Sequence, residues 1–299
     1  MPVTAAIHPA TVRAKACFLR ACELDVAVRK PGNVSRASPG HRMEADMFVA
    51  SAQAAADPLL EPGARVGARI EAAVEASWAA AGCNTNLGIV LLCAPVARAV
   101  DQQPDACTPT ALRASVEAVL ADLDVADAQA AYRAIARANP GGLGTAPRED
   151  VSQVPTVDLR TAMRLAAHRD SIARQYRNGY ADLFNKGLPA LGTGFSLMGP
   201  PANAIGDLGM VAAVQRLYLT LLAGVADSHI VRIHGEAVAH TVMSAAQAWQ
   251  SRASAGAALD GNPDFEAWDA SLKAGGINPG TTADLTVATL LISGLATQA

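Results

Sequence analysis

Three short segments of the chain carry asparagine, glycine, proline and threonine in combinations that a helical core does not require. They cover residues 29–33, 82–88 and 276–284. Each lies at the end of a predicted helix, and the second and third precede strongly apolar sequences that should be deeply buried. Free backbone N–H groups at a helix N-terminus attract anions, and glycine lets a ligand approach the backbone closely. These segments therefore predict a site for the phosphate groups of a nucleotide.

The carboxylate of Asp284 needs its own explanation, because it would repel a phosphate placed directly beside it. A carboxylate together with a phosphate is the usual way in which proteins hold Mg²⁺. If the phosphate prediction is right, Asp284 is a magnesium ligand. The alternative is a simple helix start, in which Thr281 or Thr282 caps the last helix and Asp284 lies in its first turn. This segment alone leaves both interpretations open.

Charged residues lie in and just before the first segment. Arg29 and Lys30 supply its positive charge, and Glu23 precedes them by one to two helical turns. Because seven residues separate Glu23 from Lys30, both are expected to project from one side of the helix end. Glu23 also lies between Cys22 and Leu24 on a mainly apolar helix, which favours a place in the site. The alternative for Glu23 is a solvated, charged helix face.

A fourth polar segment, residues 227–235, lies between two apolar helices. Its histidines, His229 and His234, lack the i, i+4 spacing of helical zinc ligands, so a zinc site is not predicted. Arg232 and His234 could instead bind phosphate. A salt bridge between Asp227 and Arg232 is the simpler alternative.

The composition predicts an all-α fold. Alanine is abundant, aromatic residues make up only 4% of the chain, and no two convincing strands occur together. About ten helices are expected in a single compact domain spanning residues 1–299, with a flexible loop around residues 139–155 that could act as a lid. Thr108 and Pro109 mark a further helix start. The predicted helices cover residues 9–28, 43–56, 62–80, 87–100, 124–138, 157–177, 204–226, 235–251, 262–274 and 281–296.

Charge and hydropathy exclude several classes of protein. The formal net charge is −3 and the basic residues are scattered, so nucleic-acid binding is not predicted. Charged residues interrupt the N-terminal apolar stretches, and the longest apolar run, residues 87–97, is about half a membrane span. We therefore expect a cytoplasmic protein that binds no membrane. The five cysteines form no C-x-x-C pair. A homodimer is plausible for a helical enzyme of this size.

Four segments follow one another in a recognisable order. They read Arg29-Lys30-Pro31-Gly32-Asn33-Val34, Asn84-Thr85-Asn86-Leu87-Gly88, Asp227…Arg232-x-His234-Gly235 and Asn278-Pro279-Gly280-Thr281-Thr282-Ala283-Asp284-Leu285. Together they resemble the signature segments of the triphosphoribosyl-dephospho-CoA synthase family, over nearly the whole chain. The resemblance implies an all-helical enzyme with ATP as substrate. Such an enzyme joins the triphosphoribosyl part of ATP to dephospho-CoA and releases adenine.

The resemblance also implies roles for individual residues, in agreement with the phosphate and Mg²⁺ predictions above. Glu23 and Lys30 would be catalytic, and Asp284 together with Glu23 would bind Mg²⁺. Arg232 and His234 would contact the polyphosphate. The other nucleotide contacts that the resemblance implies are Asn33, Asn84, Thr85, Asn278 and Gly280. The composition of the segments themselves adds Arg29, Gly32, Asn86, Gly88, Thr281 and Thr282 as predicted contacts.

Two departures from the family pattern concern the acceptor. Arg29 stands where the pattern usually has proline, and Asn86-Leu87 stand where lyase-linked members commonly carry His-Lys. The sequence Asn-Thr-Asn-Leu-Gly is more similar to a divergent branch associated with organisms that use tetrahydromethanopterin and methanofuran. An ATP-using enzyme of that cofactor biosynthesis, with a different acceptor, is therefore an alternative. A non-catalytic nucleotide-binding helical protein is a second alternative.

Overall fold

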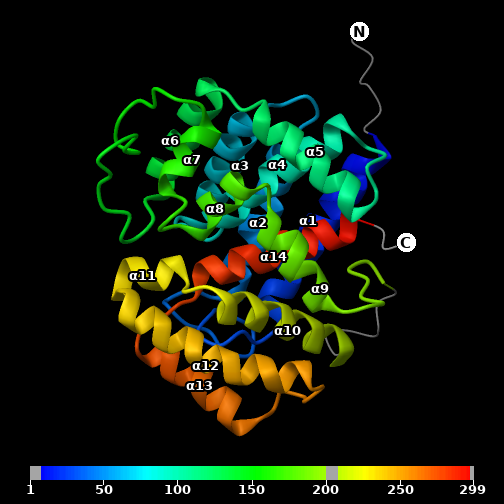
Figure 1. Ribbon diagram of the computed structural model, residues 1–299, viewed down its shortest axis with the longest axis vertical. Coiled ribbons are helices and arrows are strands. Elements are labelled where there is room, and N and C mark those ends of the chain that lie inside the picture. Colours follow the sequence, from blue (N-terminus) through cyan, green and yellow to red (C-terminus); the bar gives the residue numbers. More distant parts are fainter. Residues whose placement is uncertain (1–7, 200–207, 297–299) are drawn as a thin grey trace.

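Helices make up the regular structure of residues 8–199 and 208–296, the part of the chain that the computed structural model describes (Figure 1). These residues form fourteen α-helices, one π-helix and no strand, packed as one compact domain, which confirms the all-α prediction. The elements are α1 (Pro9–Ala27), α2 (Ala45–Leu59), α3 (Val66–Ala81), α4 (Leu87–Gln102), α5 (Pro109–Ala121), α6 (Val125–Ala138), α7 (Leu159–Ala166), α8 (Ser171–Asn178), η1 (Leu183–Gly187), α9 (Leu188–Leu191), α10 (Leu208–Gly224), α11 (Ser228–His234), α12 (Glu236–Ser254), α13 (Pro263–Ala274) and α14 (Gly280–Leu295).

The helix count exceeds ten because short capped helices were not recognised in the sequence. The helix expected over residues 157–177 is two helices, since the Asp170 side chain accepts hydrogen bonds from the N–H groups of Ile172 and Ala173 and starts α8. Asp227 starts α11 in the same way, by accepting hydrogen bonds from first-turn N–H groups. The sequence had predicted no helix in this polar segment. Residues 139–158 form no helix, as expected.

α4 lies at the centre of the larger of two hydrophobic clusters, and thirteen of its sixteen residues are buried. It packs against α1, α2, α3, α5 and α14, which explains why its sequence is apolar on every side. In Figure 1, α14 (red) crosses the middle of the molecule, with α3–α8 above it and α10–α13 below it. The first turn of α14 therefore lies where the two groups of helices meet.

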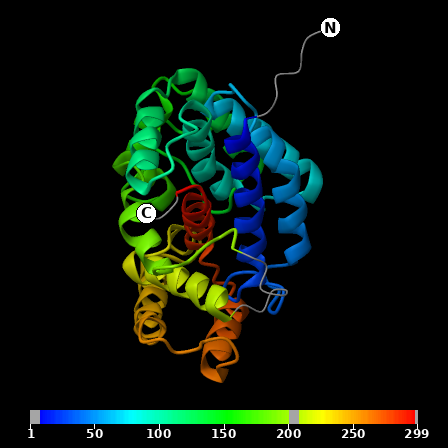
Figure 2. The same cartoon turned by 90° about the vertical axis from the view of Figure 1, so that its right-hand side faces the viewer.

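The second hydrophobic cluster is built from α10, α11, α12 and α13. Trp249 of α12 packs edge-on against Phe265 of α13, with ring centroids 5.0 Å apart. Figure 2 shows this lower group set apart from the larger helical group above it. α10 contributes to both clusters, with Leu217 on the larger one and Tyr218 on the smaller.

In the described part of the chain, no single helix has the length and apolar character needed to cross a membrane. α10 and α11 together would meet the criterion, but a bend of 55° separates them.

Candidate active site

Two glycines show that the sequence segments far apart in the chain do meet. A Cβ atom added at Gly32 would lie 2.7 Å from Cδ of Pro279 and 2.9 Å from the carbonyl oxygen of Ile277. A Cβ added at Gly88 would overlap the carboxylate of Asp284. Residues 29–33 and 84–88 therefore both contact residues 277–284 so closely that only glycine fits at these two positions.

A buried ion pair holds the first segment. Lys30 is fully buried, and its Nζ lies 3.0 Å from Oδ1 of Asp25. The same ammonium donates hydrogen bonds to the carbonyl oxygen of Asp25 (2.6 Å) and to Oδ1 of Asn33 (2.9 Å). Asn33 in turn donates through Nδ2 to Oδ1 of Asn278 at 3.0 Å. Lys30 therefore positions Asn33 and Asn278, the side-chain link between the first and third segments.

Arg29, predicted to contact the nucleotide, faces α13 instead. Its guanidinium lies 3.2 Å from Oδ2 of Asp269 and 3.2 Å from Oε1 of Glu266. Asp269 is fully buried and also accepts hydrogen bonds from the N–H of Gly32 (2.8 Å) and from Lys273. Arg29 and Asp269 thus anchor the loop to α13.

Glu23 also faces away from the other candidate residues. Its Oε2 lies 2.7 Å from Nη1 of Arg20, and its side chain is 45% exposed. The argument from the seven-residue spacing fails because α1 ends at Ala27, with Val28 in an extended conformation. Lys30 is therefore not on the helix, and the carboxylate that reaches it is that of Asp25.

Asp284 is a half-buried carboxylate that forms no hydrogen bond or ion pair with any residue that the structure describes. Burial raises its pKa well above the usual range, and the carboxylates of Asp25 and Asp227 raise it further. The helix-cap interpretation is wrong, because α14 begins after Pro279 with no side-chain cap and no acidic residue in its first turn. The carboxyl group of Asp284 is thus available to a ligand, and a bound cation would favour its charged form.

α11 is tied to the start of α14 by buried polar groups. Oδ2 of Asp227 accepts from both the backbone N–H and the hydroxyl of Thr282, each at 2.7 Å. The hydroxyl of Ser228 donates to that of Thr281 at 3.2 Å. Thr281 and Thr282, predicted as nucleotide contacts, are buried and serve this junction.

Arg232 forms its ion pair with Asp170 (2.9 Å) rather than with Asp227, which corrects the simpler alternative. Its Nη2 lies 3.4 Å from Nδ1 of His229, and because arginine can only donate, that nitrogen must be the acceptor. Burial lowers the pKa of His229, and the charge of Arg232 lowers it further. His229 is therefore a neutral imidazole with its proton on Nε2. The ring of His234 donates through Nε2 to the carbonyl oxygen of Gly276 at 3.1 Å.

Within residues 84–88 the three polar side chains have different partners. Oδ1 of Asn84 accepts from the N–H of Leu87 (3.2 Å), and the Thr85 hydroxyl donates to that of Ser51 (2.7 Å). Asn86 precedes α4 but does not cap it, and its buried Nδ2 has no partner among the described residues. α4, like α14, thus has no cap from the residue that precedes it, and its side-chain acceptor comes from a residue further away.

A metal ion would need ligands from the substrate. No three His, Cys, Asp or Glu side chains among the described residues are placed to hold one.

The sequence did not predict three residues that lie among the candidate site residues, namely Asp25, Asp170 and His229. Only Asp170 carried a local signal, since an Asp two residues before Ile172 can begin a helix.

Comparison with known proteins identifies the family of this chain. The model of the ATP:dephospho-CoA triphosphoribosyl transferase family matches residues 11–299. The chain belongs to this family. Membership in the triphosphoribosyl transferase family makes the protein an ATP-using transferase and confirms the resemblance found in the sequence.

A solved structure confirms the fold independently. A protein from Archaeoglobus fulgidus, proposed to be a triphosphoribosyl-dephospho-CoA synthase, is 22% identical and superposes with a TM-score of 0.60. The match covers 82% of this chain and 96% of that one. No curated protein matches the sequence.

Proposed function

We propose that the protein transfers the triphosphoribosyl group of ATP to a hydroxyl of dephospho-CoA and releases adenine. The observation that carries this proposal is the convergence of the signature segments around one unpaired carboxylate, Asp284. The N-termini of α4 and α14 adjoin there, since Gly88 lies against Asp284. Such termini stabilise anions, and family membership supplies the identity of the anion as ATP.

Mg²⁺ fits the residues present. Asp284 offers carboxylate oxygens with no partner in the described structure, and burial raises the free energy of its charged form. Mg²⁺ usually binds through one or two carboxylates together with phosphate oxygens, so the lack of three protein ligands is compatible with it. The ion would neutralise the polyphosphate charge and the charge of Asp284 together.

The remaining residues act by binding and orientation. Arg232 and His234 contact the polyphosphate, and His229 donates a hydrogen bond from Nε2 to the bound substrate. Lys30 is fully buried and acts through Asn33, to which it donates a hydrogen bond. Glu23 stays paired with Arg20, outside the reaction.

In the reaction the ribose C1′–N bond of ATP breaks with oxocarbenium character, while the acceptor oxygen bonds to C1′. The acceptor hydroxyl loses a proton and adenine gains one. Fixed charges that hold the polyphosphate and ribose in line stabilise this transition state.

The test is to incubate the purified protein with ATP, Mg²⁺ and dephospho-CoA and to measure free adenine by chromatography. Adenine that appears only when all three are present supports the proposal. Lack of adenine with every acceptor tried would refute glycosyl transfer.

The same assay decides between the acceptors. Adenine formed with a pterin or furan intermediate, and not with dephospho-CoA, would place the protein in one-carbon cofactor biosynthesis. ADP or AMP would indicate a kinase or a ligase instead. Binding of ATP with Mg²⁺ without any product would indicate a non-catalytic nucleotide-binding protein.

A further inference from the structure

An arginine-lined groove lies outside the candidate active site. It has a volume of about 450 Å³, and its walls come from α5, α7 and the C-terminal end of α8. Ligand pockets are commonly of about 300–1,000 Å³. The lining residues are Thr110, Arg113, Ala114, Glu117, Arg160, Arg177, Asn178 and Gly179.

The charge of this groove is positive and only partly compensated. Three arginines and one glutamate line it, which leaves a formal net charge of +2. Arg160 is paired with Glu117 at 2.6 Å. Arg113 and Arg177 form no ion pair with any carboxylate that the structure describes. By contrast, Arg133 on α6 pairs with Glu71 on α3 through two of its nitrogens.

Two of the three guanidinium groups are held in place by hydrogen bonds, and for Arg113 all the recorded acceptors are neutral. Arg113 donates to the carbonyl oxygen of Gly179 (3.3 Å) and to Oδ1 of Asn185 (3.1 Å), both neutral acceptors. Arg160 is buried and donates to the carbonyl oxygen of Tyr176 at 3.0 Å. Positioning by neutral acceptors keeps the positive charge and reduces the entropy lost when an anion binds.

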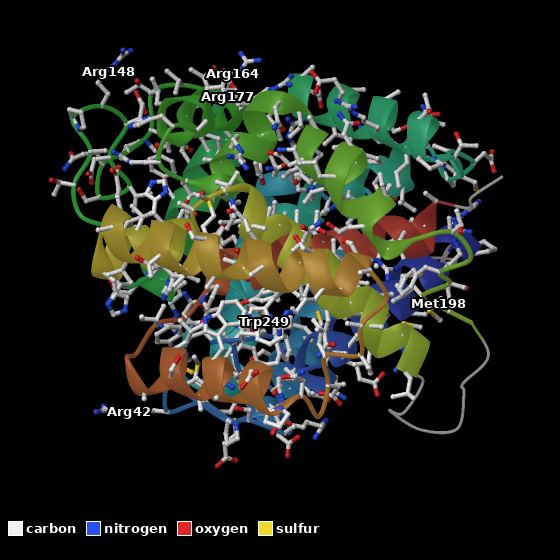
Figure 3. The ribbon with its side chains drawn as sticks, turned by 60° about the horizontal axis from the view of Figure 1, so that its bottom comes forward. Arg42, Arg148, Arg164, Arg177, Met198 and Trp249 are labelled. Atoms are coloured by element: carbon white, nitrogen blue, oxygen red, sulfur yellow. The ribbon has the colours of Figure 1, made fainter. Side chains whose placement is uncertain are left out.

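The third guanidinium is exposed. Arg177 projects outward from α8, on the same side of the molecule as Arg164 of α7 (Figure 3). Arg177 forms no hydrogen bond or ion pair with any residue that the structure describes, so none would have to break for a ligand to bind. An anion entering the groove would therefore meet a fixed Arg113 and a free Arg177.

We propose that this groove binds a diphosphate group. Guanidinium groups bind phosphate oxygens through paired hydrogen bonds, and two uncompensated arginines match two phosphates. α8 connects the groove to the active site, since Asp170 at its start pairs with Arg232 and Gly179 follows its end. The eight residues of α8 span roughly 12 Å.

The diphosphate has two chemical sources. It is either the diphosphate of the acceptor nucleotide, which rests on the proposed function, or that of a separate phosphorylated ligand. A long acceptor with its reacting hydroxyl near Asp284 could extend along α8 into the groove. Kinetic measurements separate the two sources.

The binding test measures the affinity for inorganic pyrophosphate by isothermal titration calorimetry, without added Mg²⁺. We expect Arg113→Gln/Arg177→Gln to weaken one binding event at least tenfold, and Arg232→Gln to leave that event intact. Arg133→Gln is the matched control, because it removes the same charge from an ion pair outside the groove. Equal pyrophosphate binding by the double variant and by Arg133→Gln would overturn the proposal.

The single variant Arg177→Gln shows whether weaker binding could come from misfolding. It should fold normally, since the exposed Arg177 side chain forms no contact with any residue in the described structure. It should weaken the same binding event while its melting temperature stays equal to that of the wild type. Unchanged pyrophosphate binding by this variant and by the folded double variant would refute the site.

The kinetic test identifies the source. A tenfold rise in KM for dephospho-CoA, with KM for ATP unchanged, would assign the groove to the acceptor diphosphate. Loss of pyrophosphate binding with both KM values unchanged would assign it to a separate ligand. If no adenine is formed by any variant, the proposed function fails, and calorimetry still decides whether the groove binds diphosphate.

Discussion

The described helices begin in two ways, either with a side-chain cap or without one. α6, α7 and α13 start with Asp124, Asp158 and Asn262, whose side chains accept hydrogen bonds from the first-turn N–H groups. α4 and α14 have no capping side chain on the residue that precedes them, and the same holds for α2, α3 and α12. A cap stabilises a helix by satisfying free N–H groups. What distinguishes α4 and α14 is that their N-termini adjoin, with Gly88 against Asp284. The N–H groups of Leu87 and Thr282 donate to Asn84 and Asp227, and the first-turn N–H groups that have no acceptor in the described structure are available to one ligand.

The charges show the same contrast. On the surface between α3 and α6, Glu71 pairs with Arg133 and Glu75 with Arg137. At the site, Asp284 has no partner in the described structure and lies near other carboxylates. Paired charges serve the fold, whereas an unpaired one costs stability and is available for function.

The largest effect is expected from Asp284→Asn. If Asp284 holds Mg²⁺ against the polyphosphate, the rate of adenine release should fall on the order of 10²–10³-fold, the range typical for loss of one transition-state contact. Glu75→Gln, which breaks only a surface pair, is the control and should keep full activity. Comparable rates for the two variants would remove Asp284 from the mechanism.

The same substitution should raise the stability of the free protein at neutral pH. Burial raises the pKa of Asp284 in the folded state, so the folded protein binds this proton more tightly than the unfolded chain does. Stability from this group is therefore complete below about pH 4 and is lost as pH rises above it. Melting curves should show Asp284→Asn above the wild type at pH 7, with the difference disappearing towards pH 4. A constant difference at all pH values would contradict the role of ionisation.

Gly88→Ala tests the close contact between α4 and α14. Because the added methyl group would overlap the Asp284 carboxylate, unfolding free energy should fall by about 1–3 kcal/mol and adenine release should be lost. Gly224→Ala, at the end of α10, adds the same group where no atom lies within 4 Å. That control should leave activity intact and be neutral or stabilising by up to about 1 kcal/mol. Similar behaviour of the two variants would contradict the convergence at Gly88.

The smallest effects compare one capped and one uncapped helix. Asp124→Ala removes a capping box and should cost about 1–2 kcal/mol of stability while leaving kcat unchanged. Asn86→Ala removes an amide that caps nothing and whose Nδ2 is unpaired. It should leave the urea midpoint unchanged and raise KM for a substrate. A stability loss at Asn86 as large as that at Asp124 would show that the start of α4 is an ordinary structural cap.

Local signals in the sequence predicted much of the fold. Thr108 before Pro109 marked the start of α5, and apolar residues on all sides of α4 marked it as central. Signals that depend on tertiary contacts could not be read in the same way. The break between α7 and α8 depends on Asp170, which also pairs with Arg232 of a distant helix.

The candidate site was predicted in part. Four segments were recognised by pattern, and the close approach of Gly32 and Gly88 to the third segment agrees with a common site. The direction in which individual side chains point could not be predicted from the sequence. Whether Glu23 or Asp25 reaches Lys30 depends on the residue at which α1 ends, and helix ends are the least predictable feature.

α10 limits how substrates can enter. Leu217 and Leu221 belong to the larger hydrophobic cluster, and Tyr218 and Leu222 belong to the smaller one, so a single helix lies in both. The two clusters cannot rotate apart as rigid bodies without pulling one face of this helix out of its core. A hinge between them is therefore excluded by packing. We therefore expect any movement that admits substrate to Asp284 to come from loops, and product release through such loops commonly limits turnover.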